Sequence, residues 1–243
     1  MTKNLVDLLW RESATARTGG RRGPQARVST SAVVDAAIAI ADAGGTAAVT
    51  IRALAQELGI TTMSVYTHVN SRADLLVLMA DAVHARIEPD ESEAFASSWR
   101  DRVRAVAETN LALLRAHPWL LDVTDPRLAV GPGTIAKYDR ELHAFDGLDL
   151  ADVDRDAALS FVLDFARAAG ARANAEASAE EFGDFWADAA PRLAVHLGDA
   201  FPLAQAVGAA AGESMGAPYD ARAAWAFAVE RMLDGLAGLV ERR

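Results

Sequence analysis

Three short segments with helical periodicity, each with its own start signal, follow one another within about forty residues of the N-terminal third of this chain. Each begins after a Ser or Thr that can cap a helix, and the first two end at glycine. The predicted helices span residues 30–43 after Ser29, 51–58 after Thr50 and 62–68 after Thr61. Three helices this short and this close together in the sequence can form only a small helical unit.

The rest of the chain also has the periodicity of helices. It contains no alternating apolar and polar run long enough for a sheet, and the 51% hydrophobic content can fill a core. Further helices are predicted at residues 72–88, 98–116, 134–145, 152–174, 181–197 and 219–241, with a weaker one at 200–211. The fold class is therefore expected to be all-α.

The second and third helices have the residues that a helix-turn-helix needs. Ala55 is small where the helices must approach, Gly59 permits the turn, Ile60 fills the corner and Val65 points inward. The outward face of the third helix carries Thr62, Met63, Ser64, Thr67 and His68. Hydroxyls can bond base edges or phosphates, and the methyl groups of Thr and Met can contact a thymine methyl. This face suits the major groove of DNA, although it lacks an arginine for guanine.

The distribution of charge supports this interpretation better than the net charge does. The chain carries a net charge of −10, which disfavours a nucleic-acid partner if it is spread evenly. However, residues 1–72 hold eight Lys and Arg against five Asp and Glu, a net +3, which leaves −13 on residues 73–243. Residues 17–27 hold four arginines in a glycine-rich stretch, and residues 1–27 are predicted to form a flexible basic arm. The alternative for this arm is a solvated tail.

Residues 50–72, TIRALAQELGITTMSVYTHVNSR, resemble the signature of the tetracycline-repressor (TetR) family. The similar features are the Leu-Ala pair of the second helix, the Gly-Ile-Thr turn, the Val-Tyr-Thr-His-Val segment and a basic residue that opens the fourth helix. The resemblance is strong over residues 28–80, and the rest is similar in its helical layout, including the His117-Pro118-Trp119 corner. It implies a DNA-binding domain at residues 28–72 and a larger helical ligand-binding and dimerisation domain at residues 73–243.

The resemblance also implies roles for single residues. Thr62, Met63 and Ser64 are expected to read bases, and Tyr66, His68 and Arg72 to contact the DNA backbone, the last aided by the helix dipole. The basic arm could enter the adjacent minor groove. The residues expected at DNA are Arg21, Arg22, Arg27, Arg52, Thr61, Thr62, Met63, Ser64, Tyr66, Thr67, His68 and Arg72. The alternatives are a half-buried aromatic at a helix junction for Tyr66 and an ordinary surface histidine for His68.

A single helix-turn-helix makes too few contacts for a specific site, so a homodimer on a palindromic operator is expected. The long helices at 152–174 and 219–241 carry apolar residues on more than one face and are the candidates for the interface, unless they are core helices of a monomer. A small-molecule effector is expected in the apolar core of the larger domain. Its candidate ligands, for each of which a plain core or surface role is the alternative, are Trp99, Asn110, Tyr138, Asp164, Phe165 and Trp186.

Several other classes of function have no support in the sequence. The chain has no cysteine and no pair of histidines at metal-binding spacing, and it lacks the common nucleophile, phosphate-loop and zinc-protease motifs. We therefore expect no cofactor and no catalysis. No apolar stretch near the start is long enough for a secretory signal or a membrane span, which predicts a cytoplasmic protein with no membrane partner.

The expected function is that of a transcriptional repressor that a small molecule releases from its operator. A transcriptional activator would have the same sequence features. The alternative is a helical protein that binds a small molecule or a partner, or an enzyme, whose helix-turn-helix no longer binds DNA.

Overall fold

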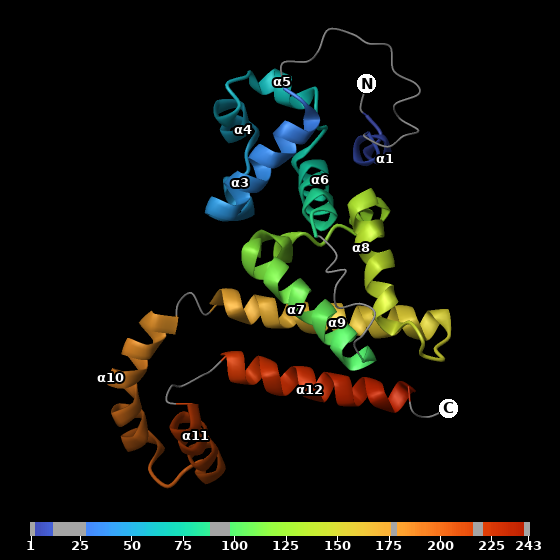
Figure 1. Ribbon diagram of the computed structural model, residues 1–243. Coiled ribbons are helices and arrows are strands. Elements are labelled where there is room, and N and C mark those ends of the chain that lie inside the picture. Colours follow the sequence, from blue (N-terminus) through green and yellow to red (C-terminus); the bar gives the residue numbers. More distant parts are fainter. Residues whose placement is uncertain (1–2, 12–27, 88–97, 176–178, 216–220, 241–243) are drawn as a thin grey trace.

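The computed structural model describes residues 3–11, 28–87, 98–175, 179–215 and 221–240, which form helices and turns without any strand (Figure 1). The all-α prediction is confirmed. The α-helices are α1 (Leu5–Leu9), α3 (Thr30–Ala48), α4 (Ile51–Glu57), α5 (Thr62–Tyr66), α6 (Arg72–Ala85), α7 (Trp99–Ala116), α8 (Pro132–Leu142), α9 (Asp152–Ala175), α10 (Ala179–Leu197), α11 (Pro202–Met215) and α12 (Ala221–Val240). The short 3-10 helices are η1 (Pro118–Asp122), η2 (Pro126–Val130) and η3 (His143–Phe145).

Helix α3 begins where the sequence predicts and is interrupted at its predicted end. The Ser29 side chain accepts a hydrogen bond from the backbone N of Ala32 at 3.0 Å, which caps the first turn. Gly45 has φ +71° and kinks the helix, and one further turn extends to Ala48. Because glycine adopts positive φ without steric cost, the chain bends at Gly45 and continues. The first continuous stretch of helix thus ends at Gly44 and Gly45, as predicted, and a further short turn follows it.

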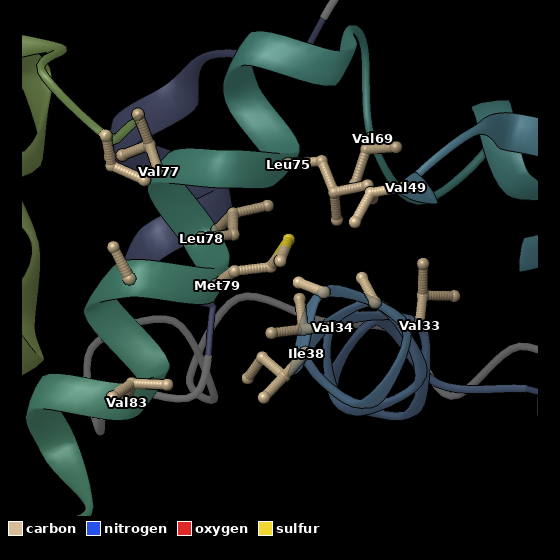
Figure 2. Packing of buried hydrophobic residues seen from close by; sticks show 14 of the residues in the cluster. Val33, Val34, Ile38, Val49, Val69, Leu75, Val77, Leu78, Met79 and Val83 are labelled. Carbon is tan, nitrogen blue, oxygen red and sulfur yellow. The ribbon is translucent and has the colours of Figure 1, made fainter. Parts of the chain in front are cut away.

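Helix α6 packs across α3 and closes the small N-terminal head that α3, α4 and α5 form (Figure 2). Leu75, Leu78 and Met79 of α6 are at most 2% exposed and belong to the same apolar cluster as Val34 and Ile38 of α3. Each such side chain contributes about 1.5 to 3 kcal/mol when fully buried. This cluster fixes the direction of α6 relative to the helix-turn-helix.

The larger body, α7 to α12, has a second apolar cluster, which α7, α9 and α12 supply. Val103, Val162 and Leu233, one from each of these helices, are fully buried in it. Helices α10 and α11 lie beyond the end of α9, away from this packing (Figure 1). Val195 and Leu203 on them are 81% and 77% exposed. The body therefore leaves apolar surface uncovered.

Helix α6 is also tied to the body through the start of α8. The Asp81 carboxylate accepts a hydrogen bond from the backbone N of Thr134 at 2.8 Å, so a side chain of α6 caps α8. A Cβ on Gly131 would lie 2.1 Å from Asp81 Oδ1, and a Cβ on Gly133 would lie 2.1 Å from the Asp81 backbone oxygen. Only glycine allows so close an approach. Helix α6 is thus the rigid link between the head and the body.

The N-terminal residues differ from the predicted flexible arm. Residues 5–9 form α1, which lies beside α6, and Leu8 and Leu9 are buried at 4% exposure in the apolar cluster of the head (Figure 1). The expectation of an arm is therefore wrong for residues 3–11. Residues 12–27, with Arg21, Arg22 and Arg27, lie outside the described residues.

Within the described part of the chain, α3 has the length and apolar composition of a membrane span, with a mean hydropathy of 1.2. Val33, Val34, Ala37 and Ile38 of this helix are at most 4% exposed inside the head. Packing against α6 therefore accounts for its hydropathy.

Candidate nucleic-acid interface

Helices α4 and α5 are held at a tight corner by local signals of the sequence. The hydroxyls of Thr50 and Thr61 accept hydrogen bonds from the third backbone N of the helix that each one starts, both at 3.1 Å. Gly59 has φ +61°, and the next residue, Ile60, donates its backbone N–H to the carbonyl of Ala55 at 3.0 Å. This closes α4 as a left-handed glycine cap does. These local hydrogen bonds define the geometry of the corner.

The residues predicted inside the corner are inside it. Leu54 and Val65 are fully buried and Ala55 is 7% exposed, while Ile60 packs against the same cluster. Because α5 has only five residues, this packing, and not its own propensity, holds it in place. The corner therefore presents α5 on a rigid base.

The outer face of α5 is open to solvent. Met63 is 73% exposed and Tyr66 is 53% exposed, and Thr61, Thr62 and Thr67 are exposed beside them. Arg52 is exposed on the preceding helix. Large apolar side chains held on a rigid, exposed helix indicate a surface that another molecule covers.

Two of the predicted contact residues have hydroxyls that the protein already uses. The Ser64 hydroxyl lies 2.9 Å from that of Thr61, and the Thr67 hydroxyl donates to the Ser64 carbonyl at 2.6 Å. Both interactions complete the ends of α5. Thr62 and Met63 are therefore the better placed of the predicted base-reading residues.

His68 and Arg72 are anchored more firmly than sequence reasoning expects. The His68 Nδ1 lies 3.0 Å from the hydroxyl of Thr30, and burial, together with the smaller effect of the Lys3 charge, lowers the pKa of His68. The imidazole is thus neutral at pH 7, so His68 can form hydrogen bonds but carries no positive charge. Arg72 donates to the carbonyls of Thr46 at 2.6 Å and Val49 at 3.3 Å, so its guanidinium supports the junction between α3 and α4.

The six residues proposed from the sequence to bind an effector do not meet in one cluster. Asn110 is 7% exposed inside the body, whereas Tyr138 and Trp186 are 42% and 38% exposed. Tyr138 donates its hydroxyl to Asp156 at 2.7 Å, and Asp164 is exposed on α9. Asp164 therefore lies outside the apolar core in which an effector is expected.

The two remaining aromatic candidates pack within the body. Phe165 is partly buried and stacks on Trp225, with ring centroids 5.0 Å apart. Trp99 is also partly buried, and the guanidinium of Arg100 lies 5.1 Å from its ring centroid. These contacts support a structural role for both rings.

Sequence reasoning missed a buried polar cluster around Asn110. Its side-chain amide donates to Glu141 at 2.6 Å, and Glu141 also accepts from the ammonium of Lys137 at 2.7 Å. Lys137 and Glu141 are 6% and 7% exposed, and burial lowers the pKa of Lys137. Lys and Glu four residues apart on a helix usually form an exposed surface pair, so spacing alone cannot find this buried cluster.

The comparisons with known proteins match both parts of the chain. Residues 33–79 match the family model described as bacterial regulatory proteins, tetR family, and residues 89–240 match the one described as tetracyclin repressor-like, C-terminal domain. The HTH-type transcriptional repressor DrrR1 of Streptomyces coeruleorubidus is 31% identical over 246 residues, which cover 98% of this chain and 86% of that protein.

Solved structures from Streptomyces coelicolor are similar along most of the chain. The TetR family protein ActR, in complex with (S)-DNPA, is 25% identical with a TM-score of 0.64, and the match covers 88% of this chain and 100% of that one. The TetR regulator SCO7222 is 26% identical with a TM-score of 0.63, over 88% of this chain and 99% of that one. The similarity therefore extends over the head and the body together.

Proposed function

This chain belongs to the tetR family of bacterial regulatory proteins, and on that premise we propose that it is a repressor that binds a palindromic operator as a homodimer and is released by a small molecule. The observation that carries the proposal is the exposed face of α5 on its rigid corner. Met63 and Tyr66 are 73% and 53% exposed, although the head has an apolar core in which other large side chains are buried. A duplex in contact with α5 would cover this face. Operator binding would place the protein in the cytoplasm, where the DNA is.

We assign the DNA contacts on α4 and α5 by position and exposure. Thr62 and Met63 would meet base edges in the major groove, and Arg52 and Tyr66 would contact phosphates on either side. Arg72 would act mainly through the position of α4, because its guanidinium already donates to two carbonyls. Phosphate contacts of this kind position the head, and the bases then specify the site.

A second copy of the chain is the partner that fits the uncovered apolar surface of the body. Phe161 of α9 and Phe227 of α12 are 51% and 66% exposed, and these two helices lie side by side (Figure 1). The same two helices from each subunit would form a four-helix interface. Two-fold symmetry then presents two copies of α5 to half-sites about 34 to 36 Å apart.

For the effector we propose a site in the body that includes Asn110 as a polar group. Asn110 is the one buried member of the six candidates, and Glu141 and Lys137 beside it would add charge to an otherwise apolar surrounding. The similar proteins support control by a small molecule, since ActR was solved with (S)-DNPA and DrrR1 is described as a repressor. A ligand that moves α8 would act on the head through the Asp81 contact to α6.

A mobility-shift titration with the DNA upstream of the protein's own gene tests operator binding. Arg52→Ala and Tyr66→Phe are each expected to weaken the complex, since each dimer loses two contacts of about 0.5 to 1.5 kcal/mol, together about 5- to 150-fold. Arg115→Ala is the matched control because Arg115 is exposed on α7, outside the helices α4 and α5 that carry the assigned contacts. Equal losses in the Arg115 variant, or none in the head variants, would contradict the assignment.

Release by an effector has a thermodynamic signature. A ligand that weakens operator binding by a given factor must itself bind more weakly by the same factor when operator is present. (S)-DNPA is the first compound to titrate, with and without the upstream DNA. Equal ligand affinity in both titrations would show that the compound binds without controlling the DNA complex.

A further inference from the structure

The N-terminal segment Lys3–Arg11 contacts the C-terminal end of helix α5. This segment lies outside the residues that match the family's DNA-binding model. The backbone N of Lys3 donates to Asn70 Oδ1 at 3.0 Å, and Asn70 Nδ2 donates back to the Lys3 carbonyl at 2.9 Å. The Lys3 ammonium donates to the carbonyl of Thr67, the residue that ends α5. One hydrogen bond thus ties Lys3 to the end of α5, and two tie it to Asn70 in the loop that joins α5 to α6.

The middle of this segment is anchored by burial. Asn4 caps α1 by accepting from the backbone N of Val6 at 2.9 Å, and Leu8 and Leu9 are each 4% exposed in the cluster that α3 and α6 form. A helix of five residues does not persist in water by itself. Its packing against α6 therefore maintains α1 and, with it, the position of Lys3.

The other end of the segment is attached to the body. The indole N–H of Trp10 donates to the carbonyl of Val130, the last residue of η2, at 2.9 Å. Arg127 of the same short helix pairs with Asp74 at 2.9 Å, and Asp74 accepts from Asn70 at 3.0 Å. Asn70 is thus joined to η2 by two routes, one through α1 and one through Asp74.

We propose that residues 3–11 are a brace that positions α5 for operator binding by joining its C-terminal end to η2 of the body, with Lys3 and Trp10 as the positioning residues at its two ends. This inference rests on the proposed DNA-binding function. Without the brace, Thr67 and Asn70 lose their hydrogen bonds to Lys3, although Val69 stays buried and His68 keeps its contact with Thr30. Ordering the end of α5 at the operator would then cost binding free energy. Loss of either end is therefore expected to weaken the complex with DNA.

The brace can be tested without DNA by hydrogen exchange of the full chain. Trp10→Phe keeps an aromatic ring but removes the bond to η2, and Lys3→Met keeps the length of the side chain but removes the bond to Thr67. We expect the amides of Thr67, His68 and Val69 to exchange about three- to tenfold faster in both variants, which corresponds to one lost hydrogen bond. Val6→Ala, on the exposed side of α1, is the matched control. Wild-type exchange in the Trp10 variant would overturn the proposal.

Operator affinity measured over a series of salt concentrations separates the brace from a direct phosphate contact by Lys3. The brace predicts that both variants bind the upstream DNA at least about threefold more weakly with an unchanged salt dependence. A phosphate contact instead predicts a shallower salt dependence in Lys3→Met and wild-type affinity in Trp10→Phe, and that result would overturn the proposal. If the wild-type protein bound no DNA at all, the proposed function would fail, while the exchange experiment would still decide whether the brace exists.

Discussion

Gly133→Ala is the substitution that most directly probes the contact between α6 and α8. A Cβ on Gly133 would lie 2.1 Å from the backbone oxygen of Asp81 and 2.9 Å from both N and Cβ of Ala85. The nearest atom is backbone, so no side-chain rotation relieves the clash. The two helices would have to separate by about 1 Å to restore an ordinary contact.

The cost of that separation can be estimated from the contacts that it breaks. Overpacking by a single methyl group at a close helix contact costs about 1 to 3 kcal/mol. The same movement stretches the 2.8 Å hydrogen bond from the Thr134 backbone N to Asp81, which caps α8. The free energy of unfolding is expected to fall by about 1 to 3 kcal/mol, and Tm by about 2 to 12 °C for a chain of this length.

Urea unfolding at a fixed protein concentration, paired with a mobility shift on the upstream DNA, measures both consequences, since stability and dimerisation are linked. Operator affinity should also fall, because α6 carries the head. Gly208→Ala is the control, since a Cβ there meets nothing within 4 Å and no loss of stability is expected. If Gly133→Ala unfolded and bound DNA like the wild type, the conclusion that α6 and α8 are too closely packed to admit a methyl group would be refuted.

Three other substitutions test separate parts of the structure. Burial, together with the smaller effect of the Lys137 charge, lowers the pKa of His84 from 6.5 to about 4. Between these pH values the unfolded chain therefore binds a proton at His84 that the folded chain does not bind. Stability should therefore fall by on the order of 2 kcal/mol between pH 7.5 and 5, and His84→Gln should flatten that profile in urea titrations. Lys137→Ala leaves the Glu141 carboxylate buried without its cation and should cost about 3 to 5 kcal/mol, whereas a Lys137→Met/Glu141→Leu double variant should be nearly as stable as the wild type, as a double-mutant cycle will show. Thr61→Ala removes the cap of α5 and should lower the free energy of unfolding by about 0.5 to 2 kcal/mol, with Thr61→Ser close to wild type.

The helix-turn-helix could be predicted in detail because its determinants are local. The caps at Thr50 and Thr61 and the turn at Gly59 act within three or four residues of the chain, and each is present in the structure. Gly45, like Gly59, interrupts its helix with a positive φ, but a further helical turn follows Gly45 directly. That difference depends on the residues after each glycine and on the packing of α3, which the residue type does not specify.

The parts that the sequence did not reveal depend on contacts between distant segments. Asp164 lies among apolar neighbours in the sequence but is exposed, because adjacent residues of a helix point about 100° apart. Lys137 and Glu141 have the spacing of a surface ion pair and are buried only because α8 packs into the body. The hydrogen bonds of Lys3 to Asn70 and Thr67 join residues more than sixty positions apart, and no pattern along the chain predicts them.

Selection of bound sequences from random duplex DNA tests the central claim most directly, with the wild type compared against an Arg52→Ala/Tyr66→Ala double variant. Two copies of α5 related by two-fold symmetry predict enrichment of a palindrome whose half-sites lie about one helical turn, or a multiple of it, apart. The double variant should lose that enrichment, and Arg115→Ala should keep it. An enriched motif without two-fold symmetry, or equal enrichment by the double variant, would contradict the account of a dimer that reads DNA with α4 and α5.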